Sequence, residues 1–267
     1  MDTKRILGWM AVPVMAFALI GCGEKSDKPA DQKPQSLSQQ QLSDLGAKVL
    51  KDTYKRYDDK KSCWITQGLD KVDYCMKVAS VKSVMTDEGE KVYLLATGER
   101  VDGAEANQNT AMVGMFAVKP ENGEYKVIAQ GQDIEPATGK APEGEFVQLG
   151  KNAYGWRIEK AVSEQGQNSA VTDFYMVQND QVKEVGGVAT GYDDSAMSDV
   201  DAKAKHSTKL EGKVEVDKTD ADAERYPLSV TVSGEKDGRK LSPRKYAIQF
   251  STQKGKYVAP EDYPIAE

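Results

Sequence analysis

Apolar residues near the start of the folded body recur at three- and four-residue spacing, as on one face of an α-helix. The positions that form this face are Leu42, Leu45, Val49, Thr53 and Tyr57. Ser38 and Gln41 have the spacing of a capping box, which begins a helix by satisfying its first amide groups. The pattern predicts an amphipathic helix that runs to about Asp58 and lies on a sheet or offers this face to a partner protein.

Beyond Cys75 the apolar residues alternate with polar ones or form short runs, and turn-forming residues separate them. We expect strands at residues 76–84, 91–101, 111–119, 125–132, 146–149, 155–162, 171–177, 182–190, 213–216, 228–232, 245–250 and 257–259. The pair Asn122-Gly123 is the strongest hairpin signal. The sequence therefore predicts a mainly β fold, an antiparallel meander or sandwich-like β body with one N-terminal amphipathic α-helix.

Three of the predicted hairpins are similar to one another. Each has an aromatic-bearing strand, a polar turn and a strand that ends in valine, at residues 114–127, 173–185 and 245–258. Their uneven spacing argues against a propeller or a solenoid. Two interpretations stay open, a set of repeated β modules and an ordinary meander.

The first residues follow a different pattern. Lys4 and Arg5 precede an apolar stretch, and Gly21 comes directly before Cys22. These features define a secretory signal, and the stretch is shorter than the roughly 20 apolar residues of a membrane-spanning helix. The run from Leu19 to Cys22, Leu-Ile-Gly-Cys, resembles the lipobox of bacterial lipoproteins. This resemblance implies cleavage before Cys22 and a diacylglycerol group on its sulfur; the alternative is an ordinary signal peptide with an incidental cysteine.

The residue after the cysteine is Gly23 and not aspartate, which resembles an enterobacterial sorting signal for the outer membrane. The next residues are charged or proline-rich and contain no large apolar side chain, which is typical of a flexible segment. We therefore predict a signal peptide at 1–21 and a lipidated flexible tether at 22–36. A helix plus the main β domain follow at 37–205, and a C-terminal β segment at 206–267 belongs to that domain or stands apart from it.

Charge and cysteine content narrow the partners and the chemistry. The net charge is −6 and no basic run stands out, so we do not expect nucleic acid as a partner. Cys63 and Cys75 remain once Cys22 carries lipid, and an even pair in an exported chain predicts a disulfide. A zinc pair or a redox-active dithiol is the alternative, but both usually need closer cysteine spacing.

Four groups of residues are candidates for chemistry, and each also has a structural explanation. His206 is the one histidine, so any Ser-His-Asp triad depends on it; we interpret it as a solvated loop residue. Asp193, Asp194, Asp199 and Asp201 form an acidic cluster that a calcium loop could contain. The cluster lacks the glycine and glutamate of an EF-hand loop, so we interpret it as a solvated acidic loop.

The other two groups contain aromatic residues and methionines. Tyr154, Trp156 and Glu159 have the composition of a carbohydrate site, although aromatics more often fill β cores. Core packing also explains the methionines better than thioether metal binding does. These are Met76, Met85, Met112, Met115 and Met176. We therefore expect no catalytic residues, no metal and no cofactor.

The sequence as a whole favours a lipid-anchored envelope protein that acts as a binding or scaffolding module without catalysis. Its expected partners are the membrane, through the lipid, and an envelope protein or glycan. The expected location is the bacterial outer membrane, on its periplasmic face. The alternatives are display on the cell surface and an envelope glycan hydrolase that uses two paired carboxylates.

Overall fold

Helix α1, Gln39–Tyr54, is the first element of the computed structural model, which describes residues 36–103, 110–136, 142–198 and 207–265. The amide of Ser38 donates to the side chain of Gln41, and the amide of Gln41 donates to the hydroxyl of Ser38, so the predicted capping box is present. Lys55 has a φ of 62° and ends the helix. The expected extension to about Asp58 is wrong, because Arg56–Asp58 pairs as a strand.

The strands that follow α1 form an antiparallel meander in which each strand pairs with the next one in the chain. They are β1 (Arg56–Asp58), β2 (Cys63–Gln67), β3 (Asp73–Thr86), β4 (Gly89–Arg100), β5 (Thr110–Glu121) and β6 (Glu124–Pro136). Asn122 and Gly123, with φ of 49° and 81°, form the two-residue turn between β5 and β6. Positive φ at both positions suits the right-handed twist of a hairpin, which agrees with the predicted turn.

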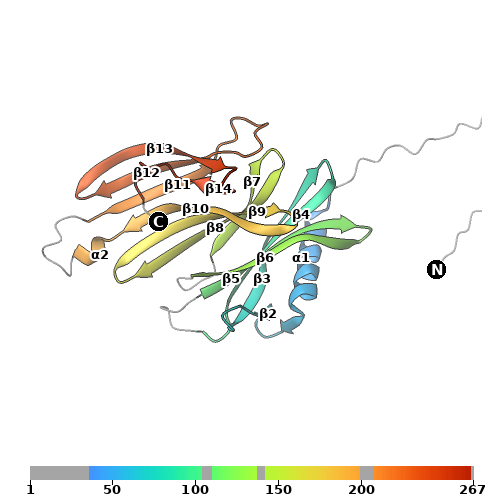
Figure 1. Cartoon of the computed structure of the whole chain (residues 1–267). Helices are drawn as coiled ribbons and strands as arrows, with labels where there is room; N and C mark the ends of the chain where they lie inside the picture. The colour runs from blue at the N-terminus through green and yellow to red at the C-terminus, as the bar shows by residue number, and fades with distance from the viewer. Residues whose placement is uncertain (1–35, 104–109, 137–141, 199–206, 266–267) are drawn as a thin grey trace, which may run out of the picture. The chain divides into compact units, whose positions relative to one another are not determined.

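A second antiparallel meander comprises β7 (Glu143–Gly150), β8 (Ala153–Glu164), β9 (Gln167–Gln178) and β10 (Gln181–Asp193). It joins the first meander through one parallel pair, Gln181 with Gln130. After the short helix α2 (Ser195–Ser198) come β11 (Lys209–Val216), β12 (Leu228–Lys236), β13 (Arg239–Ser251) and β14 (Lys256–Val258), again antiparallel to one another. Figure 1 shows these groups of strands and the helix.

Three buried clusters hold these elements in successive layers. Alternate residues of a strand point to opposite faces, and on β4 Leu94 faces α1 while Tyr93 and Leu95 face β8 and β9. The first cluster packs residues such as Val49 of α1 against Leu94. The second places Trp156 of β8 against the opposite face of the first meander.

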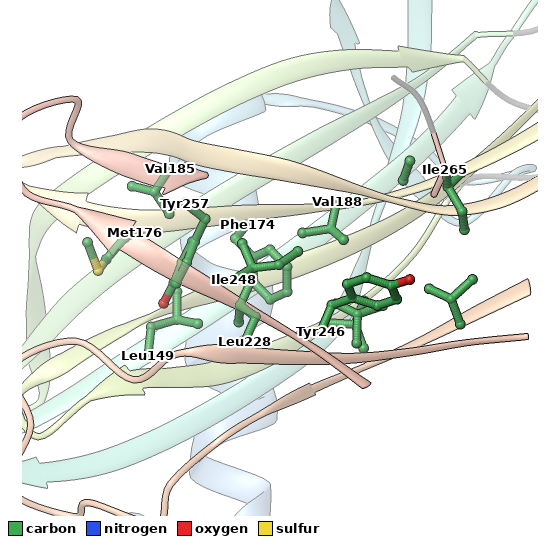
Figure 2. Packing of buried hydrophobic residues seen from close by; sticks show 14 of the residues in the cluster. Leu149, Phe174, Met176, Val185, Val188, Leu228, Tyr246, Ile248, Tyr257 and Ile265 are labelled. Carbon is green, nitrogen blue, oxygen red and sulfur yellow. The ribbon is translucent and has the colours of Figure 1, made fainter. Parts of the chain in front are cut away.

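The third cluster lies between the second meander and β11–β14. Phe174 of β9 packs in it with Leu228, Ile248 and Tyr257, as Figure 2 shows. Phe174 and Tyr175 are neighbours on β9, and they belong to different clusters, so β9 is covered on both faces. The order of layers is therefore helix, first meander, second meander and C-terminal strands. The predicted mainly β, antiparallel and sandwich-like fold with one amphipathic helix is confirmed.

Candidate functional site

A groove of about 560 Å³ lies where the C-terminal strands face the second meander. We call it the Arg157 groove. Its walls include Glu145, Arg157, Glu159, Thr172 and Thr190 on one side and residues 212–216 of β11 on the other. The volume falls in the range of about 300–1,000 Å³ that is usual for ligand sites. A smaller hollow of about 200 Å³, lined by residues 143–145, Arg157 and Glu159, shares Glu145, Arg157 and Glu159 with it.

Strand geometry brings the charged side chains of this groove together. Arg157 and Glu159 lie two residues apart on β8 and therefore point to the same face. Glu145 on β7 is directly opposite Arg157 in the register of the two strands. Their neighbours on the strand, Trp156 and Ile158, point to the other face and are fully buried in the second cluster. One strand therefore supplies both a core and a polar site.

The guanidinium of Arg157 connects three groups in the groove. Its Nε lies 3.1 Å from Oε1 of Glu145, and its Nη2 lies 2.8 Å from Oε1 of Glu159. Its Nη1 donates to the carbonyl oxygen of Val214 on β11, at 3.4 Å. The side chain is 26% exposed, so water reaches the groove but covers little of the arginine. Arg157 therefore links β8 to β11.

On the β11 side of the groove, a lysine and a glutamate form an ion pair. Nζ of Lys213 lies 2.6 Å from Oε1 of Glu215. This hydrogen bond lowers the pKa of the Glu215 carboxyl below its ordinary value, and the nearby charges of Lys213 and Lys245 add to the effect. Lys218 donates to the side-chain oxygen of Gln148 at 3.4 Å. The groove is polar without a net charge of either sign.

This arrangement suits binding better than proton transfer. A glycan hydrolase of the paired-carboxylate type needs one carboxyl group that holds a proton and gives it to the sugar oxygen. Glu145 and Glu159 instead both pair with the same guanidinium. The donors and acceptors of the groove can hold a polar ligand in a fixed orientation.

Two other hollows are shaped by groups that already have structural tasks. One of about 500 Å³ lies beside Tyr57, whose ring packs on Trp64 with centroids 4.8 Å apart. Its Arg56 is paired with Asp73 at 2.6 Å. The other, of about 360 Å³, lies beneath the C-terminal segment, where the hydroxyl of Tyr263 donates to the carbonyl of Ala189 at 2.5 Å. The first of these hollows is also lined by charged residues, Arg56, Asp58, Asp59 and Lys60, whereas the charged residues that line the second are Lys254 and Lys256.

The two cysteines expected to pair lie on neighbouring strands. Cys63 on β2 and Cys75 on β3 have their sulfur atoms at disulfide distance and their Cα atoms 5.4 Å apart. Cys63 is buried, and the pair lies at the end of the sheet formed by β1–β3. This distance fits the structural bridge that the sequence predicts. Cys22, the expected lipid attachment residue, lies outside the described residues.

Of the other candidate residues, those that the structure describes do not come together as a site. His206, Asp199 and Asp201 lie outside the described residues. Asp193 accepts hydrogen bonds from the amide and hydroxyl of Ser195, and these bonds lower the pKa of its carboxyl. Within the described ranges, no cluster of three or more His, Cys, Asp or Glu side chains could hold a metal ion.

The aromatic and methionine candidates lie mostly in the core. Trp156 is fully buried, as core packing predicts, and Glu159 points to the opposite face of β8, so the alternative carbohydrate grouping does not exist on one surface. Met85 is 47% exposed, in contrast to the other four methionines, which are at most 2% exposed. These four are Met76, Met112, Met115 and Met176.

Sequence reasoning did not identify Arg157, Glu145 or Lys213 as site residues. The signal that could have found Arg157 is its place in a predicted strand, as a charged residue between Trp156 and Ile158. Alternation alone places such a residue on the face opposite the core. It does not reveal that β11 covers that face.

Comparison of the chain with protein-family models, with curated proteins and with solved structures finds no match. Within the part of the chain that the structure describes, no helix has both the length and the apolar character to cross a membrane. The fold and the groove thus define a layered β protein with a polar groove. Its function has to be argued from these features.

Proposed function

We propose that this protein is a lipid-anchored protein of the bacterial envelope that binds an envelope partner in the Arg157 groove without catalysing a reaction. The observation that carries the proposal is the arrangement around Arg157. One guanidinium holds Glu145, Glu159 and the backbone of Val214 at the wall of a 560 Å³ polar groove. A site whose charged groups are held in place by one another is preorganised for binding.

The anchor is supported by the sequence of the first 22 residues. Lys4 and Arg5, the apolar stretch after them and the run that ends in Cys22 have the order of a lipoprotein signal. Acyl chains on Cys22 contribute about 0.8 kcal/mol of membrane affinity for each buried methylene, and two or more chains hold a protein stably. We propose the outer membrane as the location, with the folded body on the periplasmic side.

The anchor is tested with radiolabelled palmitate in cells that express the full chain or its Cys22→Ala variant. We expect label in the wild-type protein and none in Cys22→Ala, which should also leave the membrane fraction. Protease treatment of intact cells tests the side of the membrane, because a periplasmic body is protected until the outer membrane is opened. An unmodified Cys22 in the mature wild-type protein would remove the anchor from the proposal.

The binding role is tested by affinity capture with the tagged, membrane-anchored protein. The groove variant Lys213→Glu reverses one charge of the β11 wall, and Lys240→Glu makes the same change at an exposed position outside the groove. We expect an envelope component that wild type and Lys240→Glu retain and that Lys213→Glu loses. Equal recovery by all three proteins would contradict a role for the groove.

A further inference from the structure

One edge of β11 is unpaired along most of its length. All of β11, from Lys209 to Val216, pairs with β12 on one side. On its other side β11 pairs with β10 only at residues 209–211. Within the described chain no strand pairs with residues 212–216 on that side. These residues form a wall of the Arg157 groove, so the unpaired edge opens into it.

The pairing pattern shows which backbone groups face the groove. In an antiparallel strand the N–H and C=O of one residue point to the same side, and successive residues alternate. The carbonyl of Val214 accepts from Arg157 across the groove, whereas the amide of Asp217 donates to Pro227 on the β12 side. The backbone groups of Gly212, Val214 and Val216 therefore face the groove, and those of the odd-numbered residues face β12.

The ends of the groove limit the length of chain that this edge can pair with. The ladder with β10 closes one end at Glu211. At the other end the loop after β11 is fastened to the turn between β7 and β8, where the amide of Lys151 donates to Ala223 at 2.9 Å. Four residue steps separate Gly212 from Val216, which at about 3.3 Å per residue is about 13 Å. A segment of about five extended residues matches this edge.

The charges of the groove favour recognition of a main chain over recognition of an ion. Its lining has three carboxylates (Glu145, Glu159 and Glu215) and three cations (Arg157, Lys213 and Lys218). These charges cancel, and several are already paired with one another. What the groove offers beyond them is the backbone of β11 at residues 212–216, where the carbonyl of Val214 accepts from Arg157 and, within the described chain, no strand pairs on this side.

We propose that the Arg157 groove binds an extended polypeptide segment of a partner protein, which adds to the free edge of β11 as a further strand. In strand addition the main-chain hydrogen bonds supply affinity and the pockets for alternate side chains supply selectivity. Thr190 on the facing wall suits a short side chain of the segment, whereas Thr172 is only 4% exposed. Lys213 limits indiscriminate pairing, as lysines on edge strands commonly do. This inference rests on the proposed binding function and names the chemistry of its partner.

Amide hydrogen exchange tests the free edge directly in the full chain. We expect the amides of Val214 and Val216 to exchange at least about 100-fold faster than those of Lys213 and Glu215, which donate to β12. If the amides of Val214 and Val216 are as protected as their neighbours in the free protein, the edge is not available and the inference fails.

An array of random octapeptides tests the binding itself. Val216→Pro removes the donor that faces the groove, and proline is tolerated at strand edges; Val216→Ala trims the side chain and keeps the donor. We expect wild type and Val216→Ala to bind a common set of peptides that Val216→Pro binds at least tenfold more weakly. N-methylation of alternate peptide residues should weaken binding by a similar factor.

The two proposals fail in different ways in this experiment. If no octapeptide distinguishes wild type from Val216→Pro, strand addition at β11 is excluded, while the envelope partner lost by Lys213→Glu still supports a groove-binding protein. If peptides bind but affinity capture recovers no envelope component, the envelope function fails and the groove chemistry stands.

Discussion

Arg157 on β8 donates a hydrogen bond to the backbone carbonyl of Val214 on β11, with 3.4 Å between Nη1 and the oxygen. The two residues are 57 positions apart in the chain. This contact connects the second meander to the C-terminal strands at the wall of the groove, and the same guanidinium holds Glu145 and Glu159. Arg157 therefore has a part in both the stability of the fold and the shape of the candidate site.

Replacing Arg157 by methionine should lower the free energy of unfolding by about 1–3 kcal/mol, because hydrogen bonds to charged groups are lost and two carboxylates remain side by side. The measurement is urea unfolding near neutral pH. Arg244→Met is the matched control: Arg244 pairs with Asp262 at 2.5 Å, but its side chain is 64% exposed. Exposed pairs contribute about 0–1 kcal/mol.

A further comparison separates charge from packing at Arg157. Adding Glu145→Gln and Glu159→Gln to Arg157→Met removes the unpaired carboxylates, and we expect the triple variant to recover part of the lost stability. If Arg157→Met alone leaves the free energy of unfolding unchanged, the interactions among Arg157, Glu145 and Glu159 contribute little to folding.

The pair Cys63 and Cys75 joins β2 to β3 next to the end of α1. In the chain-entropy model a bridge that closes a loop of this size stabilises the fold by about 3 kcal/mol. We expect the double variant Cys63→Ser with Cys75→Ser to lose stability of that order in urea unfolding. Reducing agent should destabilise the wild type by a similar amount and leave the double variant unchanged. Labelling of both cysteines by a thiol reagent in denatured, unreduced protein would show that no bridge exists.

Gly155 and Gly212 are both strand glycines, and they differ in the space around them. A Cβ on Gly155 would lie 1.8 Å from the carbonyl oxygen of Tyr175, whereas one on Gly212 would lie 3.4 Å from its nearest neighbours. Gly155→Ala has to push β8 and β9 apart, so we expect it to cost about 2–4 kcal/mol.

Gly212→Ala should change the free energy of unfolding by at most about 1 kcal/mol, because glycine in a strand is itself unfavourable and the methyl group has room. The two variants are compared by urea unfolding under the same conditions. Equal losses at the two positions would contradict the close approach of the backbones at Gly155.

Most of the strands could be predicted from the sequence, through alternation or short apolar runs. Strands β3 to β14 each overlap a predicted strand. β1 and β2, which contain three and five residues, were not predicted, although the three-residue β14 was. Tyr57 also continues the helical spacing of α1, although Lys55 turns the chain out of the helix before it. The left-handed backbone conformation of Lys55 therefore ends the helix earlier than the apolar spacing predicts.

The groove could not be predicted, because its walls come from five strands and its geometry depends on how β11 faces the second meander. Only the pairing of Glu145 with Arg157 is nearly local, across the turn between β7 and β8. The approach of Val214 to Arg157 depends on β11 leaving β10 after Glu211. No periodicity in the sequence marks that divergence.

Buried tyrosines make the stability of the fold sensitive to alkaline pH. Burial raises the pKa of Tyr54, of Tyr93 and of Tyr263 to about 12 in each case. In the unfolded chain a tyrosine titrates near pH 10. Between these values the unfolded state binds fewer protons than the folded state, so the free energy of unfolding falls as pH rises. The stabilisation is fully present below about pH 10 and is lost as pH rises towards 12.

Tyr263→Phe tests this behaviour at one position, because it keeps the ring and removes the hydroxyl that donates to Ala189. Near neutral pH we expect a loss of about 1 kcal/mol, the usual contribution of one hydrogen bond. Above pH 10 the decline of stability with pH should be shallower than in wild type, because one fewer buried phenol loses its proton on unfolding. Urea unfolding from pH 8 to pH 11.5 measures both quantities, and absorbance at alkaline pH reports ionisation of the phenols. Parallel stability curves for wild type and Tyr263→Phe above pH 10 would contradict a raised pKa at this residue.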